Sequence, residues 1–504
     1  MHLSPSFPDF DAGFAKGSNQ VVYSRLVADL DTPVSLMMKL AGTIPNSFML
    51  ESVTGGEIKG RYSIIGMKPD LIWECHGKTS RVNRSARFDD TAFTDISGDP
   101  LAALRGLIAE SKIDLPDDLP PMAAGLFGYL GYDMIRLVEH LPNVNPDPID
   151  LPDAVMLRPS VVVIVDGVKG EITVISPAWA NSAQNARAAY NQAAERVSDA
   201  IADLNRAVTS ESRDLGDNSD NPEIQSNTTK DGYFKIVEKA KDYIRAGDIF
   251  QVVPSQRWTQ DFKLPPFALY RALRRTNPSP YMFYFNFGDF QVIGASPEIL
   301  VRVQGQEITI RPIAGTRPRG ETVEQDKAYE ADLLADPKEL AEHLMLLDLG
   351  RNDVGRVAKI GTVDPNEQFI IERYSHVMHI VSNVVGELSD DHDALSALLA
   401  GLPAGTVSGA PKVRAMEIID ELESEKRGVY GGGIGYFSAG GDMDICIALR
   451  TAVTKDKKLY IQAGGGVVYD SDPASEYQET ISKSNALRQA AKDAGLFVDF
   501  KSGN

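Results

Sequence analysis

Cysteine is scarce in this 504-residue chain, which contains only Cys75 and Cys446. Neither thiol belongs to a CxxC pair or to the spacing of a disulfide framework. Thiolate-bound zinc is therefore disfavoured, and a reducing compartment is indicated. We expect both cysteines to be buried thiols.

Positive charge is also in short supply, because 51 lysines and arginines face 70 aspartates and glutamates, a net charge of −19. Such a chain repels the phosphate backbone of nucleic acids and anionic membrane surfaces. We therefore expect neither a nucleic acid nor a membrane as a partner. The hydrophobic content of 43% is ordinary for a soluble globular protein of two domains.

Long apolar runs are missing as well. The densest run, residues 161–165, is far too short to span a bilayer, and the N-terminal segment lacks the basic flank and apolar core of a signal peptide. These features predict a cytoplasmic protein. There is also no GxxxxGK[ST] loop, and the glycine run at 431–435 is too strand-like for a dinucleotide-binding turn, which disfavours the common nucleotide-binding functions.

A polar stretch at residues 209–230 divides the chain. It is rich in Ser, Asn and Asp and poor in large apolar side chains, which is the composition of a solvated linker. Residues 1–208 mix strand-like runs with an alanine-rich helix at 182–204, whereas residues 231–504 alternate helix and strand patterns. We predict two domains of mixed α and β (α+β) class, with largely antiparallel sheets and helices outside.

Two segments place pairs of carboxylates at helical spacing. In the first, Pro337 falls in the first turn of a predicted helix that carries Glu339 and Glu342 three residues apart. The buried stripe of this helix is predicted to consist of Leu340, Leu344 and Leu347.

The second segment repeats the pattern, with Asp472 as the cap, Pro473 at the start, and Glu476 and Glu479 at i and i+3. Four hard oxygen donors without cysteine suit Mg²⁺, which keeps several waters and takes only one or two direct carboxylates. A single ExxE pair more often marks a solvated helix face. Spacing alone leaves open whether the two helices meet.

Further motifs follow in order along the chain: GDIFQVVPSQRW (247–258), NPSPYMFY (277–284), GASPE (294–298), RPIAGTRPRG (311–320), KELAEHLMLLDLGRNDVGRV (338–357), YSHVMH (374–379), PAGTVSGAPK (403–412) and IQAGGGVVYDSDPASEYQET (461–480). Together they resemble the chorismate-utilising enzymes, most closely anthranilate synthase component I. The resemblance implies a β-sandwich core with helices outside, and it makes chorismate the expected substrate.

The resemblance also implies a metal and substrate site. Glu342 and Glu479 would bind Mg²⁺ directly, with Glu339 and Glu476 reaching its waters. Arg450 and Tyr430 would hold the enolpyruvyl carboxylate, a planar anion that matches a guanidinium fork. The pocket would be lined by Gly315, Thr316, Gly464, Gly465 and Gly466.

In the reaction that the resemblance implies, ammonia attacks C2, the C4 hydroxyl leaves, and pyruvate is then eliminated. Glu298 is the candidate acid for the leaving hydroxyl, provided that burial raises its pKa. His379 is the acid–base group of the elimination, and Thr406 contacts the substrate. An enzyme that stops at the amino intermediate and a non-catalytic regulatory subunit are the alternatives.

Two positions separate this chain from related enzymes. Gln251 stands where isochorismate and salicylate synthases use a lysine to activate water, and an amide is no base at neutral pH. Ala314 stands where aminodeoxychorismate synthases place a nucleophilic lysine. With water activation and a covalent lysine route disfavoured, the expected reaction is direct attack of ammonia at C2.

Feedback inhibition by tryptophan is the last implication. The expected tryptophan-binding residues are Leu50, Glu51, Ser52, Pro280, Tyr281, Met282, Phe283, Ile434, Gly435 and Tyr436, and either Lys59 or Arg61 would supply a basic group. The plainer interpretation treats them as core strand and turn residues. Neither cysteine lies in a nucleophile elbow, so ammonia would come from solution or from a separate glutamine amidotransferase subunit (component II), in a heterotetramer.

Overall fold

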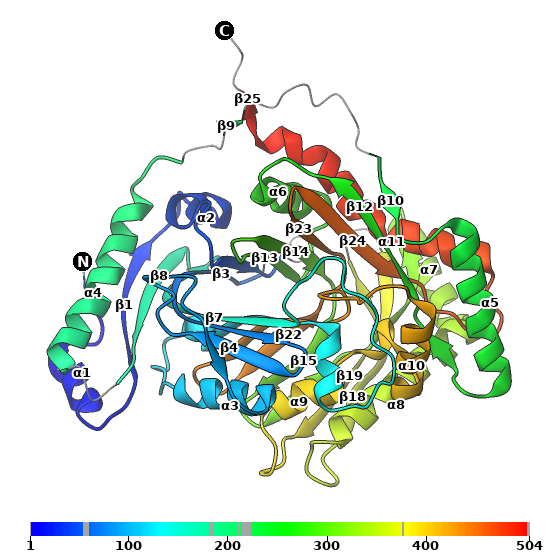
Figure 1. Cartoon of the computed structure of the whole chain (residues 1–504), viewed down its shortest axis with the longest axis horizontal. Helices are drawn as coiled ribbons and strands as arrows, with labels where there is room; N and C mark the ends of the chain where they lie inside the picture. Colours follow the sequence, from blue (N-terminus) through cyan, green and yellow to red (C-terminus); the bar gives the residue numbers. More distant parts are fainter. Residues whose placement is uncertain are drawn as a thin grey trace.

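The computed structural model describes residues 2–53, 60–180, 185–208, 212–213, 223–374 and 377–500. Its helices lie around a large sheet (Figure 1). They are α1 (Phe7–Phe14), α2 (Pro33–Leu40), α3 (Pro100–Glu110), α4 (Ala186–Leu204), α5 (Lys230–Ala246), α6 (Pro266–Thr276), α7 (Val323–Ala335), α8 (Pro337–Gly355), α9 (Ala394–Gly401), α10 (Lys412–Leu422) and α11 (Pro473–Asp493).

The strands of the first half are β1 (Gln20–Val27), β2 (Ser47–Glu51), β3 (Tyr62–His76), β4 (Thr79–Asn83), β5 (Thr94–Ile96), β6 (Gly125–Leu130), β7 (Ala154–Asp166), β8 (Glu171–Ala178), β9 (Ser212–Arg213) and β10 (Gln225–Ser226). Those of the second half are β11 (Gln251–Val252), β12 (Ser255–Asp261), β13 (Tyr281–Asn286), β14 (Phe290–Ser296), β15 (Ile299–Gln304), β16 (Glu307–Ile310), β17 (Ile313–Pro318), β18 (Asp364–Arg373), β19 (Val377–Glu387), β20 (Gly409–Ala410), β21 (Gly433–Ser438), β22 (Met443–Ile447), β23 (Thr451–Lys455), β24 (Lys458–Gly464) and β25 (Asp499–Phe500).

Strands from both ends of the chain share one sheet that closes on itself. β2 pairs with β13, and β6 pairs with β21, so N-terminal strands are hydrogen-bonded to C-terminal ones. Among the described strands only β9 and β25 pair in parallel. The predicted α+β class, with antiparallel strands and outer helices, is confirmed.

The division into residues 1–208 and 231–504 stays a prediction. Much of the proposed linker at 209–230 lies outside the described residues, but its last part is not all loop. Gln225 and Ser226 form β10 and pair with Thr259 and Trp258 of β12. The polar composition therefore did not reveal a short edge strand.

The core consists of apolar clusters between the sheet and its helices. α6 packs against α11 through residues such as Leu273 and Leu487, which are fully buried. α4 covers β1 and β8 at the left edge of the view in Figure 1. Cys75 and Cys446 are buried free thiols, as predicted, and burial raises the pKa of Cys75 to about 12. None of the helices in the described ranges is both long and apolar enough to cross a membrane.

Helix α8 begins where the sequence predicts, but its buried face is different. Asp336 caps it by accepting hydrogen bonds from the backbone N–H groups of Lys338 and Glu339. The buried residues are His343, Leu346, Leu347, Gly350, Asp353 and Val354. The prediction for Leu344 was wrong, since it is 49% exposed. Residues 343, 346, 347 and 350 follow the i, i+3, i+4, i+7 rule, so a histidine occupies the place assigned to a leucine.

Helix α11 also begins as predicted. The Asp472 side chain accepts a hydrogen bond of 2.9 Å from the backbone N–H of Ser475, and Pro473 is the first helical residue. An acidic cap and an N-terminal proline therefore fix the starts of both helices that carry the ExxE pairs. These two starts set the orientation of the four glutamates.

Candidate active site

Glutamates of the two ExxE helices influence one another's charge. The carboxylate of Glu342, on α8, accepts a hydrogen bond of 3.1 Å from Nε2 of Gln251 on β11. Burial raises the pKa of Glu342, and the negative charges of Glu339 and of Glu479 on α11 raise it further. Carboxylates shift one another's pKa only at short range, so α8 and α11 present these groups to a common region.

On α11, Glu476 is the other partly satisfied carboxylate. Its Oε1 accepts a hydrogen bond of 2.7 Å from the Ser471 hydroxyl, but its Oε2 is buried without a hydrogen-bond partner in the described structure. Burial raises the pKa of Glu476, and the charge of Glu479 adds to the shift. A buried acceptor of this kind is costly unless a cation or donor reaches it.

Lys483 is a residue of this site that the motif analysis missed. Its Nζ lies 2.7 Å from Oε1 of Glu479 and donates a 3.1 Å hydrogen bond to the carbonyl of Gly464. The available signal was its position four residues after Glu479 on the same helix face. Lys483 thus brings a positive charge into the carboxylate cluster.

The donor set suits a hard divalent cation. Within the described ranges no three His, Cys, Asp or Glu side chains already converge as a ligand group. Glu342 instead accepts a hydrogen bond from Gln251, and Glu479 pairs with Lys483. Yet the carboxylates repel one another and Glu476 keeps an unpaired buried oxygen. Mg²⁺ would relieve both costs with all-oxygen ligation.

Glu298 lies just after β14 and is only 6% exposed. The Thr406 hydroxyl, in the short 3₁₀ turn Gly405–Val407, lies 3.4 Å from its Oε2. Burial raises the pKa of Glu298 to about 8, against the smaller opposing effect of the Thr406 hydrogen bond. The carboxyl group therefore carries a proton at neutral pH and can act as an acid.

His379 is fixed in one tautomer by its backbone partner. Its Nδ1 lies 2.8 Å from the carbonyl oxygen of Gly315 and 3.1 Å from the Thr316 hydroxyl, across the β17–β19 pair. A carbonyl only accepts, so Nδ1 carries the proton and Nε2 holds the lone pair of the neutral ring. Burial lowers the pKa of His379, which favours the neutral form. Nε2 is therefore available as a base.

Arg450 is a half-buried cation without a partner anion among the described residues. It lies in the turn between β22 and β23 with a left-handed φ of 48°. No hydrogen bond or ion pair to its guanidinium is found among the described residues. Burial lowers its pKa, with Tyr374 and Glu298 nearby. An unpaired guanidinium in such a place is unfavourable unless a carboxylate binds it.

The glycines predicted to line the pocket do bring the backbone close to functional groups. A Cβ on Gly464 would lie 3.0 Å from the Tyr430 hydroxyl, and one on Gly466 would lie 2.7 Å from Nε2 of Gln251. Gly465 stands similarly near Glu476, at 3.3 Å. Gly315, with a φ of +70°, faces Oε2 of Glu339 at 3.1 Å, which connects the His379 side of the site to the carboxylates.

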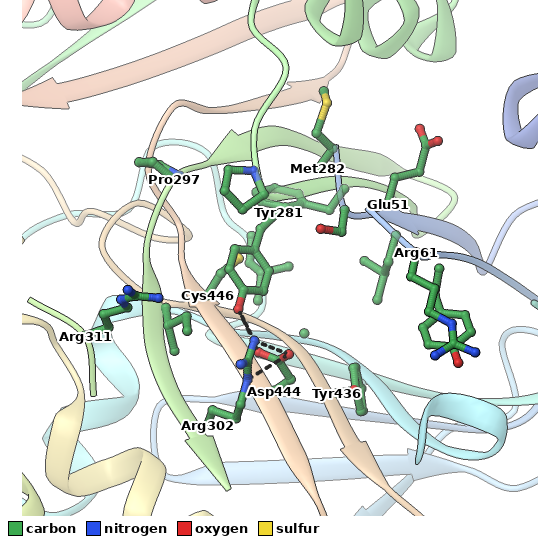
Figure 2. A pocket seen from close by; sticks show the side chains of 18 of the residues that line it. Glu51, Arg61, Tyr281, Met282, Pro297, Arg302, Arg311, Tyr436, Asp444 and Cys446 are labelled. Carbon is green, nitrogen blue, oxygen red and sulfur yellow. Dashed lines mark hydrogen bonds and ion pairs between the residues drawn. The ribbon is translucent and has the colours of Figure 1, made fainter. Parts of the chain in front are cut away.

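A cavity of about 990 Å³ is lined by all ten residues expected to bind tryptophan. Figure 2 shows two more polar side chains in it, Arg302 and Asp444. Arg302 donates to the Tyr281 hydroxyl over 2.7 Å and pairs with Asp444 at 3.1 Å. The sequence signal for Arg302 and Asp444 was a charge within each of two apolar strands. Arg61 also lines the cavity, whereas Lys59 lies outside the described residues.

Glu51 has a more specific place in this cavity than the sequence indicated. Its carboxylate is buried and bonds to Arg274 on α6, at 2.8 and 3.1 Å, and to the Tyr270 hydroxyl. Both oxygens are therefore already engaged, and Glu51 links the cavity wall to α6.

Comparison with known proteins agrees with this geometry. Residues 68–489 match the family model described as chorismate binding enzyme. The chain is 73% identical to anthranilate synthase component 1 of Cereibacter sphaeroides over 98% of both chains, and 49% identical to that of Pseudomonas putida over 94% of this chain and 96% of the relative. The crystal structure of anthranilate synthase component I from Streptococcus pneumoniae TIGR4 superposes with a TM-score of 0.74 at 39% identity, covering 86% and 93% of the two chains.

The chain belongs to the chorismate-binding enzymes. Within that family it groups with anthranilate synthase component 1, to which it is similar over nearly its full length. It is thus a chorismate-utilising enzyme of the anthranilate synthase type.

Proposed function

We propose that this enzyme converts chorismate and ammonia into anthranilate, pyruvate and water, depends on Mg²⁺, and is inhibited by tryptophan. The observation that carries the proposal is Glu298, a buried carboxyl group that holds a proton at neutral pH beside Thr406. Hydroxide is a poor leaving group, so its departure from C4 needs such an acid. The proposal is tested by incubating the purified chain with chorismate, Mg²⁺ and an ammonium salt and measuring anthranilate and pyruvate.

Arg450 and Tyr430 supply the anion-binding part of the proposal. The guanidinium has no carboxylate partner in the described structure, and the Tyr430 hydroxyl lies beside the Gly464 backbone. A planar carboxylate fits a guanidinium fork and a phenolic donor together. We assign them to the enolpyruvyl carboxylate of chorismate.

The metal part rests on the four glutamates. Glu342 and Glu479 would hold Mg²⁺ directly, and Glu339 and Glu476 would reach its waters. Bound there, the ion would neutralise the carboxylates and hold the ring carboxylate of chorismate, which they would otherwise repel.

Gln251 supports amination rather than hydration. Its amide donates to Glu342 and cannot take a proton from water at neutral pH. Ammonia is itself the nucleophile and needs no base before it attacks C2. The C2–N bond forms as the C4–O bond breaks. Glu298 delivers its proton to the leaving C4 oxygen, which departs as water, and the ammonium group formed at C2 releases one proton, so atoms and charge balance.

The geometry of His379 favours the complete reaction over one that stops at the amino intermediate. A His379→Ala variant is expected to form anthranilate and pyruvate about 10²–10⁴-fold more slowly while the amino intermediate accumulates. The assay follows chorismate loss, anthranilate fluorescence and pyruvate together. The exposed His392→Ala is the control. Unchanged pyruvate release by His379→Ala would remove this residue from the elimination.

Tryptophan inhibition is assigned to the cavity that holds Leu50, Ser52 and Tyr436. Ser52→Phe is expected to occupy part of that space, so the tryptophan concentration giving half inhibition should rise about tenfold or more, in line with about 1.4 kcal/mol of lost binding per decade. Activity without tryptophan should stay near that of the wild type. Ser18→Phe, an exposed site outside the cavity, controls for the added ring. Equal sensitivity of both variants would place the inhibitor elsewhere.

A component 1 protein implies a second component, and we propose that it is a glutamine amidotransferase subunit, joined in a heterotetramer. The described site contains no cysteine positioned as a glutaminase nucleophile, since Cys75 and Cys446 are both buried with raised pKa values. Glutamine should therefore support the reaction only when the partner is added, whereas ammonium ions should support it without one.

A further inference from the structure

Arg427 lies behind the active site and contacts two of its segments at once. It is 4% exposed. Its Nη1 donates a 2.5 Å hydrogen bond to the carbonyl of Val407, the residue after Thr406. Its Nη2 donates a 2.6 Å hydrogen bond to the carbonyl of Val253, two residues after Gln251. The guanidinium carbon also stands 5.5 Å from the centre of the Tyr430 ring.

Glu423 holds the guanidinium in this orientation. Its Oε2 accepts a 3.0 Å hydrogen bond from Nε of Arg427, and its Oε1 accepts one of 2.5 Å from Nη2. The same Oε1 accepts hydrogen bonds from the backbone N–H and the hydroxyl of Ser255, at 2.7 and 2.9 Å. The bidentate pair is thus anchored to β12, directly after the Val253 segment.

We propose that Arg427, oriented by Glu423, is a positioning residue that sets the spacing between the Gln251 segment, the Thr406 turn and the Tyr430 ring. The inference rests on the proposed function for the roles of those three residues. Arg427 itself touches no reacting atom.

The chemistry explains why an arginine is needed. One planar fork donates in three directions, to Glu423 and to two carbonyls from separate segments, while its face meets an aromatic ring. A lysine would keep the charge but has a single nitrogen. A buried ion pair contributes little net stability relative to apolar residues of similar size. We therefore assign the Arg427–Glu423 pair a role in fixing the geometry rather than in stability.

The test compares Arg427→Lys with Arg158→Lys. Arg158 is also a mostly buried arginine, paired with Asp70 and Glu110 and stacked on Trp179, away from the active-site residues. We expect Arg427→Lys to lower kcat about tenfold or more and to raise KM for chorismate, after correction for the folded fraction. The hydrogen bond from Thr406 lowers the pKa of Glu298. If Arg427→Lys displaces Thr406, the pKa of Glu298 rises further, and the alkaline limb of the variant's pH–rate profile should move to higher pH. Arg158→Lys should leave all three unchanged.

Glu423→Gln keeps the volume of the side chain and serves if Arg427→Lys does not fold. It should show the same fall in kcat and the same shift of the alkaline limb. Unaltered kcat, KM and pH profile in the folded variant would overturn the positioning role. Absence of turnover in the wild type and in Arg158→Lys would instead count against the proposed function.

Discussion

Glu298→Gln is expected to slow anthranilate formation by about 10²–10⁴-fold, the usual contribution of a positioned general acid. The amide keeps the size and the hydrogen bond to Thr406 but has no proton to give to the C4 oxygen. Chorismate binding, measured by calorimetry, should change little. Glu298→Asp is the matched control, because it keeps a carboxylic acid on a side chain that is one methylene shorter. Partial activity in Glu298→Asp would show that the loss in Glu298→Gln comes from the missing proton.

The pKa of Glu298 also gives this prediction a pH dependence. The acid is protonated below about pH 8, so the wild-type rate should fall as the pH rises through 8. Folding raises this pKa from an ordinary 4.5, so the folded chain binds the additional proton between these values, and stability declines with rising pH across that window. Glu298→Gln lacks this loss, so its Tm should exceed that of the wild type by more at pH 9 than at pH 5. Parallel Tm curves would contradict the raised pKa.

Glu342→Gln should weaken the proposed binding of Mg²⁺ and lower the activity that depends on it. Loss of a direct carboxylate ligand is expected to weaken Mg²⁺ binding by about 100-fold or more, with activity falling in parallel. Even the loss of a group that only orients a metal ligand weakens metal binding by about 10–100-fold. Without Mg²⁺ the variant should be more stable than the wild type, because burial and two neighbouring carboxylates disfavour the Glu342 charge.

Calorimetric titration with Mg²⁺ and thermal unfolding in a chelator measure these effects separately. Glu324→Gln, an exposed position on α7, provides the matched control. Full activity of Glu342→Gln at limiting Mg²⁺, with unchanged affinity, would rule out this glutamate as a ligand.

The sequence was informative wherever local signals were strong. Proline and aspartate at the helix starts fixed α8 and α11 correctly, and the i, i+3 spacing placed each glutamate pair on one face. That glutamates of the two helices face a common region depends on the tertiary fold, which no local pattern encodes. Only the resemblance to the chorismate-utilising enzymes led us to expect this arrangement of the four glutamates.

Errors and omissions arose where tertiary context overrides local pattern. Leu344 was predicted to be buried because Leu340, Leu344 and Leu347 recur at helical spacing. His343 is buried instead, and its Nε2 lies 2.6 Å from the Ser382 hydroxyl. Lys483 and Arg427 were missed because a lysine or arginine in a sequence more often marks the surface. Their roles come from partners that are close in space and distant in the chain, such as Gly464 and Val253.

We propose that this chain, without a partner, carries out both amination and pyruvate elimination on chorismate. The purified chain is incubated with chorismate, Mg²⁺ and an ammonium salt at mildly alkaline pH, and anthranilate fluorescence and pyruvate are followed with and without tryptophan. We expect equimolar anthranilate and pyruvate, suppressed by tryptophan. Chorismate left unchanged, or an amino product without pyruvate, would show that the chain does not catalyse this reaction.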